Sequence, residues 1–322
     1  MTISLTRWRL VFHYVFGPVP SRRLGRSMGV NVVPLKYCNF NCIYCQLGRT
    51  RYLINDLRMF SPPEDIIREM EAAVKSRDYD YLTFIGDGEP TLYAGLGELV
   101  KWAKENQDKP LAILTNGAKL TDERVRDWLS NLDVVKVSTD AGNERAFRLI
   151  NRPHREVTFE RFIEGIEKFR EVFHGQIWSE VMLVRGVNDN EDEARRIGEA
   201  LRRYKPDRVY VMIPTRPPAE SWVKPPESNA LITFAKNLSR YVNSDKVFII
   251  DYVESGEFHI DKSDPLNSLL NILRVQPMTV EQVMNVIERN KLDPLILDSV
   301  RSLTKEVTFN GIKYLVYSSE HD

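Results

Sequence analysis

The sequence predicts an α/β fold, a partial (β/α)6 TIM-like barrel followed by a small C-terminal winged-helix-like domain. The first observation is an alternation of short apolar strands with amphipathic helices up to about residue 215, which is typical of a parallel sheet with right-handed crossovers. The second is a change of pattern near residue 264, where three helical segments and a hairpin follow one another. We therefore expect a barrel domain at 1–258 and a winged-helix-like domain at 259–322.

Each expected strand is a short apolar run bounded by turn residues. The strands of the barrel lie at 28–33, 81–85, 111–114, 134–137, 177–184 and 209–213. A last strand is expected at 247–250. The helices between them lie at 61–75, 96–106, 122–130, 159–172, 191–203 and 230–242. The first helix is expected to open with a capping box formed by Ser61 and Glu64. Six βα units leave the closed eight-unit barrel incomplete, and in such folds the catalytic groups lie where strands end.

The C-terminal segment is expected to form its own helices and a hairpin. Helices are expected at 266–273 and at 294–303, and between them another helix is expected to begin with Thr279 as its cap residue. Asn310-Gly311 between two strand-like runs predicts a hairpin with a type I′ turn. Six Lys/Arg and eight Asp/Glu occur from residue 264 onward, which is a poor electrostatic match to nucleic-acid phosphates. Docking to the barrel, to a protein or to a peptide is therefore favoured.

Composition indicates a folded chain outside the membrane. Of 322 residues, 43% are apolar, and no apolar run approaches the roughly 20 residues that span a bilayer. We expect a soluble, cytoplasmic protein without a membrane partner. The 45 basic and 45 acidic residues cancel, but residues 1–60 hold nine Lys/Arg and one acid. Either an anion binds there or these are solvated surface arginines, and the sequence leaves both open.

All three cysteines fall within eight residues, Cys38-Asn-Phe-Asn-Cys42-Ile-Tyr-Cys45. An odd, clustered set does not suit a disulfide framework. A structural zinc site needs four ligands, yet there is no fourth cysteine and no histidine close in sequence. Three thiolates on one loop suit three irons of a [4Fe–4S] cluster and leave the fourth iron without a protein ligand.

The Cys-x3-Cys-x2-Cys run, with Tyr44 before its last cysteine, resembles the signature of the radical S-adenosylmethionine (SAM) superfamily. The resemblance implies that SAM binds the free iron. It implies that one electron from the reduced cluster cleaves SAM to methionine and a 5′-deoxyadenosyl radical, which abstracts hydrogen from a substrate. It also implies an electron donor such as ferredoxin or flavodoxin.

Polar residues follow successive strands in the order that the superfamily uses to contact SAM. The residues that the resemblance assigns to SAM are Gly86, Asp87, Gly88 and Glu89 after the second strand, Asn116 after the third, Ser138 and Asp140 after the fourth, and Glu180 and Arg185 with the fifth. Each has an ordinary structural alternative as a turn residue, a helix cap or half of an ion pair.

Three further segments resemble the uncharacterised UPF0026 radical SAM proteins, whose core is similar to that of the tRNA wyosine-forming enzymes. They are Phe16-Gly-Pro-Val-Pro-Ser-Arg-Arg-Leu-Gly25, Gly86-Asp-Gly-Glu-Pro-Thr-Leu92 and Asn151-Arg-Pro-His154. The wyosine-forming enzymes carry additional N-terminal cysteines for a second cluster. This chain has only three cysteines, so it lacks the cysteines for that second cluster.

Arginine suits bidentate capture of carboxylate or phosphate. We predict that Arg22 and His154 contact an anionic substrate, whether a small molecule, an RNA or a peptide; the alternative is that the arginines form structural ion pairs. Two other functions stay open. One is tRNA base modification of the wyosine type, and the other is a non-enzymatic iron–sulfur redox sensor that uses the winged helix for contacts.

Overall fold

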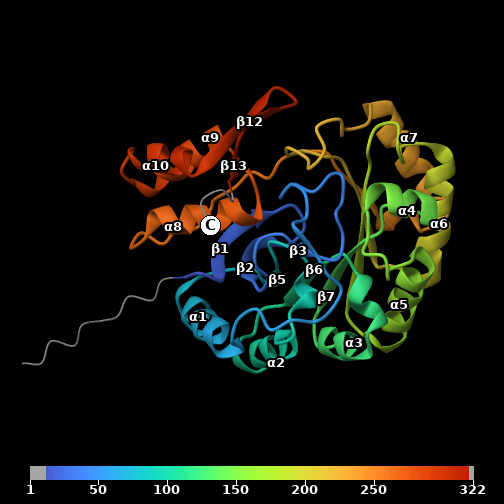
Figure 1. Cartoon of the computed structure of the whole chain (residues 1–322), viewed down its shortest axis with the longest axis horizontal. Coiled ribbons are helices and arrows are strands. Elements are labelled where there is room, and N and C mark those ends of the chain that lie inside the picture. Colours follow the sequence, from blue (N-terminus) through green and yellow to red (C-terminus); the bar gives the residue numbers. More distant parts are fainter. Residues whose placement is uncertain (1–11, 319–322) are drawn as a thin grey trace, which may run out of the picture.

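The computed structural model of the chain describes residues 12–318, and its main element is an eight-stranded sheet (Figure 1). In spatial order the strands are β1 (Val15–Ser21), β2 (Gly25–Asn31), β5 (Tyr81–Ile85), β6 (Leu111–Thr115), β7 (Val134–Ser138), β8 (Gln176–Met182), β9 (Arg208–Met212) and β10 (Val247–Ile250). From β2 onward neighbouring strands are parallel, and β1 pairs antiparallel to β2. Because β1 and β10 are the two edges of the described sheet, the barrel is open.

Helices connect the parallel strands and surround the sheet (Figure 1). They are α1 (Pro63–Ser76), α2 (Leu96–Asn106), α3 (Glu123–Leu129), α4 (Glu144–Ile150), α5 (Phe159–Val172), α6 (Glu191–Tyr204) and α7 (Ser228–Leu238). Short 3-10 turns lie at Pro90–Leu92, Ala118–Thr121 and Ser244–Lys246. Helices α4, α5 and α6 begin after Asn143, Thr158 and Asn190, whose side chains accept hydrogen bonds from first-turn amides. The α/β class and the parallel strands confirm the predicted fold.

The capping box predicted at Ser61 is wrong. Helix α1 begins at Pro63, Pro62 occupies the N-cap position, and no side chain caps it. The fixed φ of proline favours a helix start without such a cap. Ser61 serves tertiary packing instead, because its hydroxyl accepts from Tyr14 at 3.1 Å and its carbonyl accepts from the Tyr93 hydroxyl at 2.9 Å.

Strand β1 and helix α4 were not among the predicted elements. Strand β1 contains Gly17, Pro18 and Pro20, residues that normally mark a turn. Proline is tolerated here because β1 is an edge strand, where one side of the backbone needs no ladder partner. Helix α4 has only seven residues, too few for a clear amphipathic repeat.

A second unit follows the barrel and lies beside β1 (orange to red in Figure 1). It consists of α8 (Pro265–Val275), β11 (Met278–Thr279), α9 (Val280–Asn290), α10 (Ile296–Ser302), β12 (Thr304–Phe309) and β13 (Ile312–Tyr317). Thr279 caps α9 as predicted. Positive φ angles of 48° at Asn310 and 78° at Gly311 agree with the predicted type I′ turn. The winged-helix class and the boundary at 258 stay predictions.

The C-terminal unit shares its apolar core with the barrel. Phe16 and Val19 of β1 are buried in one cluster with residues of α8, α9 and β13. Burial of this apolar surface stabilises the contact, so the unit covers the β1 edge of the main sheet. Within residues 12–318 the structure has no helix of the length and apolarity needed to span a bilayer.

Candidate active site

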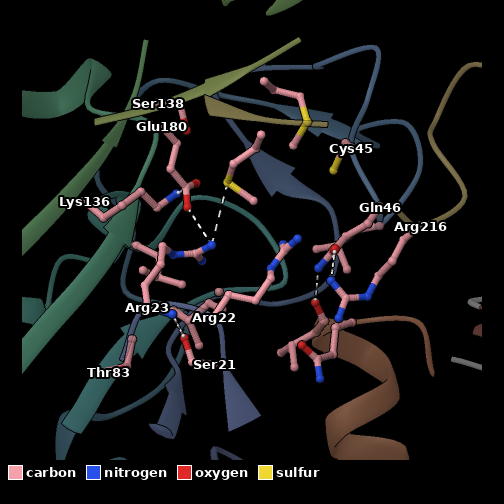
Figure 2. Close-up of a pocket in the computed structure, with 18 of the residues that line it drawn as sticks. Ser21, Arg22, Arg23, Cys45, Gln46, Thr83, Lys136, Ser138, Glu180 and Arg216 are labelled. Atoms are coloured by element: carbon pink, nitrogen blue, oxygen red, sulfur yellow. Dashed lines mark hydrogen bonds and ion pairs between the residues drawn. The ribbon is translucent and has the colours of Figure 1, made fainter. Parts of the chain in front are cut away.

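A cavity of about 320 Å³ lies inside the open barrel and at the edge where its parallel strands end. Cys38, Cys42 and Cys45 line it from the loop after β2. Side chains from the β1–β2 turn, from strands β5 to β9 and from the C-terminal unit complete the wall. Figure 2 shows Cys45 on one side of this space and Arg22, Arg23 and their partners on another.

The cysteine loop is held at its base and in its middle. Cys38 ends the short strand β3 (Tyr37–Cys38), which pairs with β4 (Tyr52–Leu53) and so closes the loop at its base. In the middle, the amide of Ile43 donates to the carbonyl of Ile150 at the end of α4, and the amide of Asn41 donates to that of Asn151, both at 2.9 Å. The unpredicted helix α4 therefore fixes the loop that carries the thiols.

Two asparagine side chains point N–H groups at the thiols. Nδ2 of Asn116 lies 3.7 Å from Sγ of Cys38, and Nδ2 of Asn151 lies 3.6 Å from Sγ of Cys42. The amide of Phe40 also donates to Sγ of Cys38, at 3.4 Å. Burial raises the pKa of the Cys38 and Cys42 thiols, so without a metal they are held neutral, and binding of iron must release their protons.

Asp140 ties the cysteine loop to the sheet. One of its oxygens accepts from the hydroxyl of Tyr44 at 2.5 Å and from Nδ2 of Asn151 at 2.7 Å. The other accepts from the amide of Met182 in β8 at 2.8 Å. Asp140 is buried and is not among the residues that line the cavity. Its contacts are those of a positioning residue.

We expect Tyr44→Phe to lower the free energy of unfolding by about 1–3 kcal/mol, because it removes one donor from the buried Asp140 carboxylate. Thermal unfolding of the metal-free protein measures this as a fall of several degrees. Tyr252→Phe, at a tyrosine that is 52% exposed, is the matched control. Equal melting temperatures for all three proteins would show that the contact does not hold the loop.

Gly88 is required by close packing. A Cβ at this position would lie 1.7 Å from the carbonyl oxygen of Tyr37, so only glycine allows the turn after β5 to contact the strand that ends in Cys38. The contact is hydrogen-bonded, since the amide of Glu89 donates to the same carbonyl at 3.0 Å. The glycine turn thus positions the first cysteine and also lines the cavity.

The Glu89 carboxylate accepts hydrogen bonds from several neighbouring groups. Its oxygens accept from the amide and hydroxyl of Thr91, from the hydroxyl of Thr115 and from the amide of Asn116. Burial raises the pKa of Glu89, and these hydrogen bonds act against that shift. Glu89 therefore links the turns that follow β5 and β6.

The other end of the cavity carries a buried network of charges. Glu180 on β8 pairs with Nη1 of Arg23 at 2.9 Å and with Nζ of Lys136 at 2.8 Å. Glu254 lies 3.1 Å from Nε of Arg22 and pairs with Arg216. Figure 2 shows Arg22 and Arg23, neighbours in the β1–β2 turn, reaching into this space. We call these six residues the arginine end.

We expect Glu180 to contribute to the stability of the fold in a way that is lost at acidic pH. Burial alone would raise its pKa, but Arg23 and Lys136 outweigh burial and lower the pKa to about 2. A free glutamate titrates near about 4.3. Because the folded pKa is the lower one, the contribution is present above about pH 4.3 and is lost as the pH falls toward 2.

Glu180→Gln should therefore cost about 3–5 kcal/mol of unfolding free energy at pH 7, because two buried cations lose their anion. The difference from wild type should shrink as the pH falls from 4.3 toward 2, where the wild-type carboxylate is itself protonated. Urea unfolding across this range measures the difference. Glu306→Gln, at a surface ion pair with Lys313, serves as the control. A penalty that does not change with pH would contradict the assignment.

The C-terminal unit forms part of the cavity wall. Val275 and Gln276 line the cavity, and the carbonyl of Val275 accepts from Nε2 of Gln46 at 3.0 Å. Nε of Arg216 donates to the carbonyl of Pro277 at 3.0 Å. Gln46 follows Cys45 directly in the chain, so the second unit contacts the cysteine loop itself.

Comparison with known proteins places the chain in a family. The model of the Radical SAM superfamily matches residues 32–198, just over half of the chain. The chain is also 32% identical over 302 residues to the UPF0026 protein MJ1312 of Methanocaldococcus jannaschii, a match that covers 93% of this chain and 92% of that protein. The chain belongs to the UPF0026 family of the radical SAM superfamily.

Two other similarities bear on this radical SAM protein. It is 36% identical over 283 residues to a protein named GTPase Obg from Brachyspira hyodysenteriae, a match to 86% of this chain that spans only 41% of that protein. Its fold is similar to that of SuiB from Streptococcus suis, solved with the precursor peptide SuiA. The TM-score is 0.53 at 18% identity, over 68% of this chain and 49% of that one. The second similarity concerns the fold alone.

The structure brings most of the predicted site residues of the radical SAM protein into one cavity. Those that line it are Arg22, Cys38, Cys42, Cys45, Gly86, Gly88, Glu89, Asn116, Ser138 and Glu180. Asp87 and Asp140 lie behind this wall. His154 binds the loop through its amide, which donates to the carbonyl of Asn39 at 2.7 Å. Arg185 is exposed and pairs with Glu227. Neither His154 nor Arg185 lines the cavity.

Sequence reasoning did not select several residues of the site. Lys136 was not assigned a role, although a lysine inside an apolar strand was a usable signal. Arg23 could have been chosen with Arg22. Gln46 and Glu254 carried no recognisable signal, because their positions depend on how the C-terminal unit docks.

The donor set of the radical SAM protein fits an iron–sulfur cluster. It consists of three thiols facing one cavity, and the sequence has no further cysteine, whereas a closed zinc site needs four ligands. In the part of the chain that the structure describes, no group of three His, Cys, Asp or Glu side chains is arranged to hold a metal ion on its own.

Proposed function

We propose that the protein holds a [4Fe–4S] cluster on Cys38, Cys42 and Cys45 and binds SAM beside it in the same cavity. The observation that carries the proposal is the convergence of three thiols from one clamped loop on a cavity at the edge of a parallel sheet. Three cysteine ligands leave one iron free for another ligand. Membership of the radical SAM superfamily supports this assignment.

When bound, the reduced cluster and SAM supply a 5′-deoxyadenosyl radical that abstracts a hydrogen atom from the substrate. The protein's own residues prepare the site. The N–H groups of Asn116 and Asn151 stabilise negative charge on the sulfurs of Cys38 and Cys42, which adjusts the reduction potential. The cysteine loop and the C-terminal unit contact each other through Gln46 and Val275 and form part of the wall of this site.

Residues on the strand ends are proposed to contact SAM. Gly86 and Gly88 offer backbone groups, while Asn116 and Ser138 offer polar side chains to the cavity. Glu180 also lines the cavity, but it is given no SAM contact in this proposal, because it pairs with Arg23 and Lys136. Asp140 is proposed to act through Tyr44 and the loop, and not on SAM directly. Asp87 and Arg185 are given no SAM contact in this proposal, because they do not line the cavity.

The cluster must receive an electron, so we propose a redox partner such as ferredoxin or flavodoxin. We also propose that the substrate is anionic, because Arg22 lines the cavity next to Arg23 and Lys136. His154 has no part in this proposal, since its side chain is not in the cavity wall.

Anaerobic reconstitution with iron and sulfide tests the proposed function. The reconstituted protein should be brown, and it should convert SAM to 5′-deoxyadenosine and methionine when dithionite is added. Liquid chromatography with mass detection measures both products, and protein without iron serves as the control. A colourless protein, or one that contains a single zinc ion and forms no 5′-deoxyadenosine, would overturn the proposal.

A further inference from the structure

The arginine end of the cavity has more positive than negative charge. Its cations are Arg22, Arg23, Lys136 and Arg216, and its anions are Glu180 and Glu254. All six side chains are at most 13% exposed. Buried charges are normally paired, because removing an ion from water is costly. Two cations beyond the number of carboxylates therefore need an explanation.

Two of these cations also have an Nε donor that makes no hydrogen bond. Nε of Arg22 and Nε of Arg23 are buried and make no hydrogen bond, although Glu254 lies 3.1 Å from the first. The Arg22 side chain is only 6% exposed. Its Nη1 group donates to the carbonyl of Tyr252 at 3.0 Å, which fixes the guanidinium in place. Buried donors of charged groups are rarely left unused.

Besides Glu180 and Glu254, one carboxylate among the described residues lines the cavity, that of Glu89, and it does not neutralise this surplus. Glu89 lies at the cysteine end, where its charge acts on Cys38, and its oxygens are already engaged by Thr91, Thr115 and Asn116. The charged groups that act most on Arg22 are Glu254, Arg23, Arg216 and Glu180. The surplus is therefore a local property of the arginine end.

We propose that the arginine end binds a phosphate monoester group of the substrate. A phosphate monoester carries close to two negative charges at neutral pH, which matches the two surplus cations. Guanidinium groups present paired donors that fit phosphate oxygens. This inference rests on the function proposed above, because it assigns the cysteine end to the cluster and SAM and the opposite end to the substrate.

Binding of methyl phosphate to the reconstituted protein with SAM tests the inference. Isothermal titration calorimetry at constant ionic strength should detect binding to the wild type. Arg22→Gln and Arg23→Gln should each weaken it by about 10- to 100-fold, because each removes charged hydrogen bonds. The affinity for SAM, measured separately, should stay within about twofold. Arg22→Lys keeps the positive charge but loses the planar pair of donors, so it should weaken methyl phosphate binding less than Arg22→Gln does. The lysine variant also keeps the test valid if the glutamine variant folds poorly.

Arg26→Gln is the matched control. Arg26 lies on β2 but is about half exposed, pairs with Asp78 and Asp80, and does not line the cavity, so methyl phosphate binding should not change. Malonate is the competing probe. If malonate binds and methyl phosphate does not, the substrate class is wrong. If both glutamine variants lose SAM affinity, the arginines hold SAM, and the inference is also overturned. Formation of 5′-deoxyadenosine without substrate reports on the proposed function separately from all these outcomes.

Discussion

Cys42→Ala is expected to abolish formation of 5′-deoxyadenosine from SAM. The variant loses one of three thiols on a loop that offers no replacement, because the sequence contains no other cysteine. The loss of 5′-deoxyadenosine formation should exceed the roughly 10- to 100-fold loss that follows when a residue that only contacts a metal ligand is removed. Iron content, the brown absorbance and 5′-deoxyadenosine after dithionite and SAM are the three measurements.

The control for this variant is Ser228→Ala, at an exposed position at the start of α7. It should bind iron and cleave SAM like the wild type. Circular dichroism should show that Cys42→Ala keeps its secondary structure, since Cys42 lies on a loop, outside the helices and strands, and only borders the main apolar core. Normal iron content and normal cleavage in Cys42→Ala would refute the cluster assignment.

Arg216→Ala is expected to lower the free energy of unfolding by about 3–5 kcal/mol. Arg216 is buried and joins three segments through Glu254, Gln46 and the carbonyl of Pro277. Its removal leaves a buried carboxylate with one cation fewer and two polar groups without their donor. The C-terminal unit should then become more accessible to protease, so limited proteolysis and thermal unfolding measure the change.

Arg289→Ala provides the comparison for Arg216. Arg289 belongs to the same C-terminal unit, but it is exposed and its partner Glu257 is also exposed. Surface ion pairs of this kind contribute little, so the melting temperature should stay close to that of the wild type. Similar effects of the two substitutions would show that Arg216 does not hold the unit on the barrel.

Sequence reasoning was reliable where the pattern is local. The strand at Leu111–Thr115 begins with a continuous apolar run, Leu-Ala-Ile-Leu, between Pro110 and the turn at Asn116-Gly117, and such runs are typical of buried parallel strands. The turn at Asn310 and Gly311 was predictable because its two residues adopt positive φ readily. The cysteine spacing was equally informative, since three thiols on one short loop must lie near one another.

Sequence reasoning failed where a contact between distant residues decides the outcome. Ser61 looked like a helix cap, yet tyrosines from two other segments take its hydrogen bonds. The partners of Asp140 could not be predicted from the sequence either, because its carboxylate accepts from Tyr44 and Asn151, which lie on other segments. Both are polar residues at strand or helix ends, where the same side chain can turn outward or inward.

The chain by itself determined the alternation of strands and helices, the three thiols and the polar residues at successive strand ends, because each depends on residues close in sequence. Only the tertiary structure decided that Arg22, Lys136, Glu180 and Glu254 share one buried network. These residues come from four segments, and their charges meet only because the sheet curves and the C-terminal unit docks against its edge. Long-range electrostatics and packing have no signature within a short stretch of sequence.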